Sequence, residues 1–164
     1  MAKIESPREL FVHKLGAALT MEETILRMLE EIAEKAKDPQ LKQNLRQHLR
    51  ETQQQVHNLE RAFAALGVEP ESQPTATIEG LEREGEQNLK DVDDSLNDAV
   101  ILAGVIETEA HEIAVYDVLI THAEGMGEED IVALFQENLE QEQATLKKAR
   151  DATKKLAQRV GQPV

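Results

Sequence analysis

Glutamates occupy positions of this sequence where an amphipathic helix would normally carry leucine. Apolar residues recur at three- and four-residue steps along four stretches of the chain, which is the spacing of one helix face. Each stretch places an acid in or beside that face, namely Glu22, Glu51, Glu142 and the pair formed by Glu109 and Glu112. Glutamate is rarely buried unless it is paired or binds a metal. Acids that converge from several helices therefore predict a shared counter-charge, for which metal ions are the obvious candidates.

The arrangement of these acids is typical of a di-metal carboxylate site inside a four-helix bundle. Such a site takes one glutamate from each of two helices and a Glu-x-x-His pair from each of the other two. Glu22 and Glu109 suit the single-glutamate positions, and Glu51 and Glu142 suit the positions on the other two helices. Bridging carboxylates are needed in such a site because two cations at short range repel each other.

The sequence departs from this pattern at the histidines. Gln54 and Thr145 stand at the two positions where the pattern has histidine. His48, three residues before Glu51, and Glu112 could supply the missing donors. The predicted metal ligands are therefore Glu22, His48, Glu51, Glu109, Glu112 and Glu142. Donors rich in oxygen suit iron, manganese, magnesium or calcium. The expected cofactor is two divalent metal ions per chain, with iron as the first choice and manganese as the alternative.

Each of these assignments has a purely structural alternative. We expect Glu23 and Glu140 to face solvent, although Glu23 would face inward if the register of its helix were shifted by one residue. Glu51 lies at the edge of its apolar stripe and could be exposed. His48 could be a hydrogen-bonded core histidine instead of a ligand. The two acids of the third long helix could be a buried pair that is hydrogen-bonded to neighbours such as Tyr116.

Helices must position these residues, because helix signals dominate the sequence and strand alternation is absent. Ser6, Asp38 and Ser95 are predicted N-caps, with Asp98 completing a capping box at the last of these, and Gly67 is a predicted C-cap. The sequence predicts one domain over residues 1–164 with helices over 7–37, 39–66, 77–90, 95–124 and 128–159. Short connections join the first two and the last two helices, which favours antiparallel hairpins. The expected fold is all-α, a ferritin-like antiparallel four-helix bundle with a short crossover helix.

Composition limits the partners that the chain could have. A net charge of −14 argues against affinity for nucleic acid, and the chain lacks the basic N-terminal arm of a DNA-coating mini-ferritin. The longest apolar run, residues 99–106, is too short to cross a membrane. The absence of cysteine and the charged N-terminus lead us to expect a cytoplasmic protein without nucleic-acid or membrane partners. Val12, Val115 and Val118 lie off the central stripes and leave apolar surface that a homodimer could cover, while the missing mini-ferritin features argue against a hollow cage.

Four segments, residues 11–15, 48–56, 111–116 and 139–142, are similar to the bacterial YciE/YciF family of ferritin-like proteins. The most specific segment is His48-x-x-Glu51-Thr52, followed by a Gln-Val pair. The resemblance covers the chain from about residue 6 to 156. It implies a ferritin-like fold, an association with bacterial stress response and a di-metal site at the acids and the histidine that match family positions. Gln53 and Gln141 depart from the family pattern.

These observations together favour a di-iron or di-manganese carboxylate protein of bacterial stress response. Its expected reaction is the oxidation of ferrous iron or the reduction of peroxide at a buried site, with oxygen or peroxide as the reactant. The alternative is a non-catalytic helical bundle with a structural metal site that acts through protein partners.

Overall fold

The computed structural model describes residues 3–160, which form helices and no strands, so the predicted all-α class is confirmed. The elements are α1 (Pro7–Lys35), α2 (Pro39–Ala65), α3 (Ala76–Asp91), the short 3-10 helix η1 (Asp94–Leu96), α4 (Asn97–Met126) and α5 (Glu129–Val160). Where these bounds differ from those expected from the sequence, they differ by one or two residues. Among the described residues, no helix combines the length and the apolarity that crossing a membrane requires.

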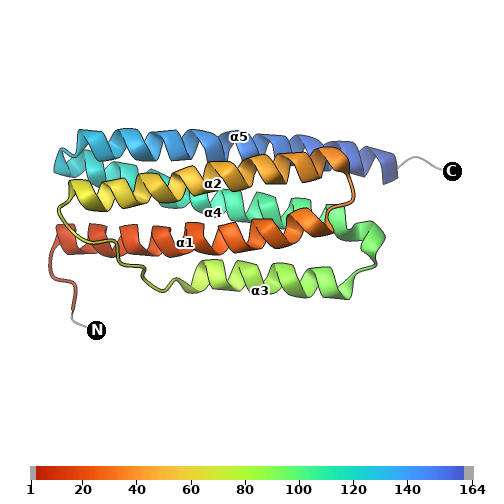
Figure 1. The fold of residues 1–164 in the computed structure, drawn as a ribbon, viewed down its shortest axis with the longest axis horizontal. Coiled ribbons are helices and arrows are strands. Elements are labelled where there is room, and N and C mark those ends of the chain that lie inside the picture. The colour runs from red at the N-terminus through yellow and green to blue at the C-terminus, as the bar shows by residue number, and fades with distance from the viewer. Residues whose placement is uncertain (1–2, 161–164) are drawn as a thin grey trace.

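The four long helices α1, α2, α4 and α5 lie side by side (Figure 1). α1 contacts α2 and α4, and α5 contacts the same two helices, so the four surround a common interior. Neighbouring long helices run in opposite directions. α3 lies outside this group against α1 and α4, and it carries the chain back along the length of the molecule before α4 begins (Figure 1).

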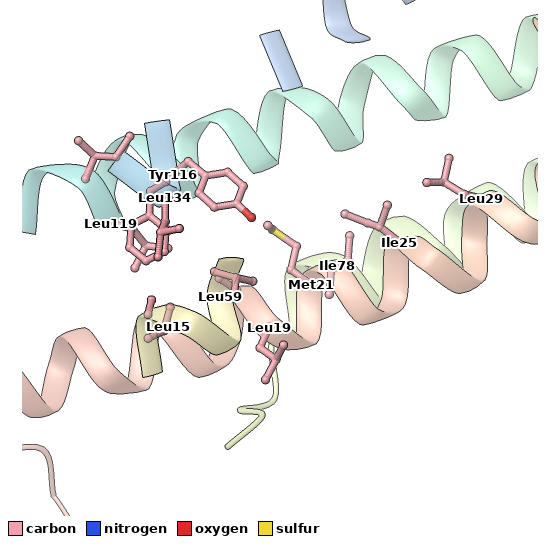
Figure 2. Close-up of a cluster of buried hydrophobic side chains, with 14 of the residues drawn as sticks. Leu15, Leu19, Met21, Ile25, Leu29, Leu59, Ile78, Tyr116, Leu119 and Leu134 are labelled. Atoms are coloured by element: carbon pink, nitrogen blue, oxygen red, sulfur yellow. The ribbon is translucent and has the colours of Figure 1, made fainter. Parts of the chain in front are cut away.

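The interior is apolar on both sides of a polar middle section. The Phe135 ring lies 6.4 Å from the ring of Phe11 and 6.1 Å from that of Tyr116, measured between ring centres. Figure 2 shows the Tyr116 ring extending from α4 toward α1, where Met21 projects to meet it. These large side chains are fully buried, and their burial stabilises the packing of the helices.

Most of the predicted helix ends are present. The Ser6 hydroxyl accepts from the Glu9 N–H at 3.2 Å, and the Glu9 carboxylate accepts from the Ser6 N–H, which completes the capping box. The Asp38 carboxylate accepts from the first N–H groups of α2 at 2.8 and 3.0 Å. Gly67 follows α2 with a φ of 69°, the left-handed conformation that glycine adopts most readily.

The predicted capping box of Ser95 and Asp98 is wrong. Ser95 lies inside η1, and Asp93 accepts from its N–H at 2.9 Å. The Asp98 carboxylate instead accepts from the N–H groups of Lys37 and Asp38, at 2.7 and 2.9 Å. The turn between α1 and α2 leaves these two donors without helical partners, and an acid from the first turn of α4 satisfies both.

The segment between α2 and α3 crosses α1 at a glycine. The Gln73 N–H donates to the carbonyl of Gly16 at 3.0 Å, and the Thr20 hydroxyl donates to the Gln73 carbonyl at 2.7 Å. A Cβ atom at Gly16 would lie only 2.4 Å from the carbonyl oxygen of Glu71. A residue without a side chain is therefore needed for this close approach, which fixes α1 just before the position of Glu22.

Candidate metal centre

Three helices bring four potential metal ligands together in the interior. His48 of α2, Glu109 and Glu112 of α4, and Glu142 of α5 each offer one ligand atom, and these atoms all lie within 4.8 Å of one another. All four side chains are buried, with exposed fractions of 3% or less. The sequence predicted each of them as a ligand, and the structure places them together.

The inward orientation of these residues follows from helical spacing. On α4 the buried positions recur at three- and four-residue steps from Leu102 to Leu119, and Glu109 and Glu112 belong to this series. On α5, Glu142 lies between the buried Asn138 and Thr145 in a series of the same spacing. Each acid therefore takes a position that packing alone would give to an apolar residue.

Glu22 of α1 is fully buried beside this group. The Tyr116 hydroxyl donates a hydrogen bond to Glu22 Oε1, whereas Oε2 is buried without a partner. Burial, followed by the charge of Glu142, raises the pKa of Glu22 to about 8. This electrostatic interaction with Glu142 extends the polar cluster across the interior from α5 to α1.

Glu51 lies outside the four-residue group. It is half-buried, and its carboxylate accepts a hydrogen bond from Gln47 Nε2 at 2.8 Å. The buried positions of α2 nearest to it are His48, Thr52 and Gln55, so Glu51 is at the edge of that face. Its charge is nevertheless near enough to contribute to the raised pKa of Glu109. Its role as a metal ligand stays a prediction.

The two acids that we expected to lie outside the metal site, Glu23 and Glu140, face solvent. Glu23 is exposed and accepts a hydrogen bond from the Ser72 hydroxyl at 3.2 Å, and Glu140 is also exposed. The expected helix register is therefore confirmed at both positions. Gln54, which stands where the di-metal pattern has histidine, is exposed, whereas Thr145 is buried.

The buried acids hold their protons more tightly than ordinary glutamates. Burial raises the pKa of Glu109 to about 8, with the charges of Glu22 and Glu51 adding to the effect and a hydrogen bond to Glu142 opposing it. Burial also raises the pKa of Glu112 and of Glu142 well above the usual range, and neighbouring carboxylates contribute in both cases. These groups can be ionised together at neutral pH only if positive charge lies among them.

The hydrogen bonds of the cluster leave many of its oxygen atoms without partners. His48 Nε2 lies 2.8 Å from Glu109 Oε1, which leaves His48 Nδ1 and Glu109 Oε2 without partners. Glu142 has one such oxygen, and neither oxygen of Glu112 has a donor outside the carboxyl groups, which pair with one another as Glu109 with Glu142 and Glu22 with Glu112. Buried polar atoms in folded proteins are nearly always satisfied. Several carboxylate oxygens and one imidazole nitrogen within 4.8 Å of one another could hold a metal ion.

Three buried amides that were not predicted as site residues surround the carboxylates. Gln55, Asn58 and Asn138 are fully buried. Gln55 Nε2 donates to Glu142 Oε1 and, at 3.0 Å, to Gln141 Oε1. The first of these bonds orients the carboxylate of Glu142, because Gln55 is on a different helix and is itself fully buried.

The remaining amides connect α2 to the tyrosine. Asn58 Nδ2 donates to Asn138 Oδ1 at 2.8 Å, and Asn138 Nδ2 donates to the Tyr116 hydroxyl at 3.0 Å. Because that hydroxyl in turn donates to Glu22, one hydrogen-bonded chain joins α2, α5, α4 and α1. The spacing of Gln55, seven residues after His48, could have identified it as inward-facing.

Comparisons with known proteins agree with this architecture. The sequence profile of a family described as a domain of unknown function, DUF892, matches residues 6–160. Protein YciF of Escherichia coli (strain K12) is 29% identical over 139 residues, which make up 84% of each chain. The crystal structure of the E. coli stress protein YciF matches with a TM-score of 0.86 and 26% identity, over 92% of this chain and 96% of that chain. YcfI from Rhodopseudomonas palustris matches with a TM-score of 0.88 and 34% identity, over 90% of this chain and 95% of that chain. The chain therefore belongs to the DUF892 family and is of the YciF type, as its sequence motifs indicated.

Proposed function

We propose that this protein is a ferritin-like di-metal carboxylate protein that oxidises ferrous iron and consumes peroxide. The observation that carries the proposal is the buried group of His48, Glu109, Glu112 and Glu142, whose carboxylate oxygens have too few hydrogen-bond partners. About two divalent ions per chain would satisfy these atoms and balance their charge, iron in the first place and manganese as the alternative.

The arrangement of the helices supports the ferritin-like assignment. α1 with α2, and α4 with α5, form two antiparallel hairpins whose interiors meet, and α3 provides the long connection between them (Figure 1). Metal sites of ferritin-like bundles lie in the interior between facing helices. The acids proposed here occupy the same part of the fold.

The contacts that each residue makes in the structure indicate how it would contribute to metal binding. Glu112, whose oxygens have no donor outside the neighbouring carboxyl groups, would hold metal through its carboxylate. Glu109 and Glu142 each have one such oxygen, and Gln55 orients Glu142. Glu22, held by Tyr116, offers a further carboxylate oxygen from α1.

The proposed reaction balances with ferrous iron, hydrogen peroxide and protons as its only reactants. Two ferrous ions, which are the substrate, lose one electron each, and one molecule of hydrogen peroxide takes up the two electrons and two protons to give two molecules of water. The raised pKa values of Glu22 and Glu109, each about 8, mean that these acids carry protons at neutral pH before metal binds. Metal binding must displace those protons into solvent, and the two protons that peroxide takes up come from the surrounding water.

A role in stress defence fits this chemistry, since removing peroxide and free ferrous iron together limits oxidative damage. The E. coli relative with a solved structure is described as a stress protein. We extend that role to this chain as part of the proposal.

A homodimer is also proposed. Val118 is 44% exposed and Leu10 is 36% exposed, so some apolar surface is left for a second copy to cover. Light scattering at micromolar concentration should give a mass of two chains, and the mass of a single chain would contradict the dimer.

The proposed reaction is tested with protein that has been stripped of metal and reloaded anaerobically with ferrous iron. After free iron is removed, peroxide is added in one sample and air in another, and the absorption of ferric iron is followed together with the remaining peroxide. We expect the bound iron to oxidise faster than the same concentration of free iron, and Glu112→Gln to abolish the difference. The variant Glu107→Gln, an exposed acid on the same helix, is the matched control. Bound iron that reacts no faster than free iron would favour a structural metal site instead.

A further inference from the structure

A second feature of the structure is a partly open apolar pocket between α1, α3 and α4. It has a volume of about 350 Å³, which is within the range of small-molecule sites in proteins. Its walls are formed by side chains such as Ile25 and Leu29 of α1, Leu81 and Leu89 of α3, and Val100 of α4. Exposed residues such as Glu31 and Glu107 contribute to its lining, so the pocket is open to solvent.

Two glycines line the pocket. Gly85 of α3 and Gly104 of α4 both line it, and a Cβ atom added to either would have no other atom within 4 Å. Glycine inside a helix costs up to about 1 kcal/mol relative to alanine. Neither glycine has a positive φ or a close backbone neighbour that would require it. The space that the missing side chains leave is therefore the structural effect of these glycines.

The pocket reaches the candidate metal centre. His48 and Glu109 are both among its lining residues. His48 is 3% exposed and Glu109 is 1% exposed, and each has one buried side-chain atom, Nδ1 and Oε2 respectively, without a hydrogen-bond partner. The pocket thus combines apolar walls with a small polar inner end, which is the usual composition of a small-molecule site.

Charge at the pocket selects against anions. Glu31, Glu82, Glu86 and Glu107 contribute to its lining, and of the described residues that form the pocket none is lysine or arginine. We propose that the pocket binds a neutral, largely apolar small molecule that has at most one polar group, with that group at the end near His48 and Glu109. This inference goes beyond the proposed function, because the apolar walls do not depend on metal.

The test uses a pair of fluorescent molecules that differ by one charged group. N-phenylnaphthylamine is neutral, and anilinonaphthalene sulfonate is the same molecule with a sulfonate added. Each is titrated into the metal-free protein. We expect saturable binding of the neutral molecule, with the sulfonate binding roughly tenfold or more weakly because of desolvation and repulsion at the acidic lining.

Variants at the glycines show whether binding occurs in this pocket. Gly104→Leu should weaken binding of the neutral molecule roughly tenfold or more by filling the space, and Gly85→Leu should do the same from the other wall. Gly80→Leu is the matched control, because Gly80 also has open space around it but does not line the pocket. All three replacements favour helix formation, and circular dichroism with thermal melting checks folding.

Three results would overturn the proposal: no saturable binding of the neutral molecule, equal binding of the sulfonate, or unchanged binding by a folded Gly104→Leu protein. If the wild-type protein is a dimer that binds no dye and Gly104→Leu makes it a monomer in sedimentation, the hollow is an interface between copies and the proposal is wrong. The iron content of Gly104→Leu should match that of wild type. Dye binding without iron binding would therefore contradict the proposed function alone.

Discussion

Replacing Glu109 by glutamine removes a buried negative charge at nearly constant volume and should stabilise the metal-free protein at neutral pH. The pKa of Glu109 is about 8 in the folded protein, against an ordinary value of 4.5. Between these two values the folded state binds more protons than the unfolded chain, so its stability falls as the pH rises. The contribution of this group is fully present below pH 4.5 and is lost as the pH rises to about 8.

The size of the effect follows from the same values. At about 1.4 kcal/mol for each pH unit above 4.5, keeping Glu109 protonated at pH 7 costs on the order of 3 kcal/mol. Glutamine is neutral at every pH and does not carry this cost. The side-chain oxygen of the glutamine can still accept a hydrogen bond from His48. Its NH₂ group would replace Oε2, which has no hydrogen-bond partner, and an unsatisfied buried NH₂ group costs roughly 1–3 kcal/mol. The expected net gain in the free energy of unfolding at pH 7 is on the order of 1 kcal/mol or more.

Urea unfolding of wild type and Glu109→Gln, after removal of metal, measures this difference at pH 4.5 and pH 7. The gain should be present at pH 7 and absent at pH 4.5. Glu107→Gln, on the exposed side of the same helix, should change stability little at either pH. The reasoning is refuted if Glu109→Gln destabilises the metal-free protein at pH 7 and binds as much metal as wild type, because Glu109 would then be a structural hydrogen-bonding acid.

Three further results are expected. Tyr116→Phe removes the hydroxyl that donates to Glu22 and should lower the free energy of unfolding, measured by urea denaturation, by about 1–3 kcal/mol. The metal content should stay unchanged, and loss of metal would make Tyr116 part of the site. Gly16→Ala should cost about 1–3 kcal/mol in the same assay, because its Cβ would lie 2.4 Å from the Glu71 carbonyl oxygen, and a neutral effect would show that this segment moves freely. Adding ferrous iron to the stripped protein at pH 7 should release protons, measured with an indicator dye in weak buffer, and binding without release would contradict the raised pKa of Glu109.

The sequence predicted the all-α fold and most of the polar interior, because both depend on helical spacing. Glu109, Glu112 and Glu142 replace apolar residues in regular series, and a carboxylate in such a position has few alternatives to burial with a counter-charge. The buried polar residues of α2 were harder to predict from the sequence. Gln55 and Asn58 are of types that are usually exposed, so their positions on an inward face carried less weight than those of the acids.

Other features depend on contacts between distant parts of the chain. Asp98 caps the turn between α1 and α2 instead of its own helix, because its partners come from a segment about 60 residues earlier. The apolar pocket lies where α3 packs against α1 and α4, and it is lined by residues of all three helices. Helical periodicity describes one helix at a time and contains no information about such neighbours.

The central claim is that the interior carboxylates bind metal, and crystals grown with ferrous iron test it most directly. An anomalous-difference map recorded at the iron absorption edge locates the metal without assumptions about the ligands. We predict strong peaks, about two per chain, within coordination distance of Glu109, Glu112, Glu142 and His48. A map without peaks among these residues, or with iron only on exposed acids such as Glu23 and Glu140, would contradict the account.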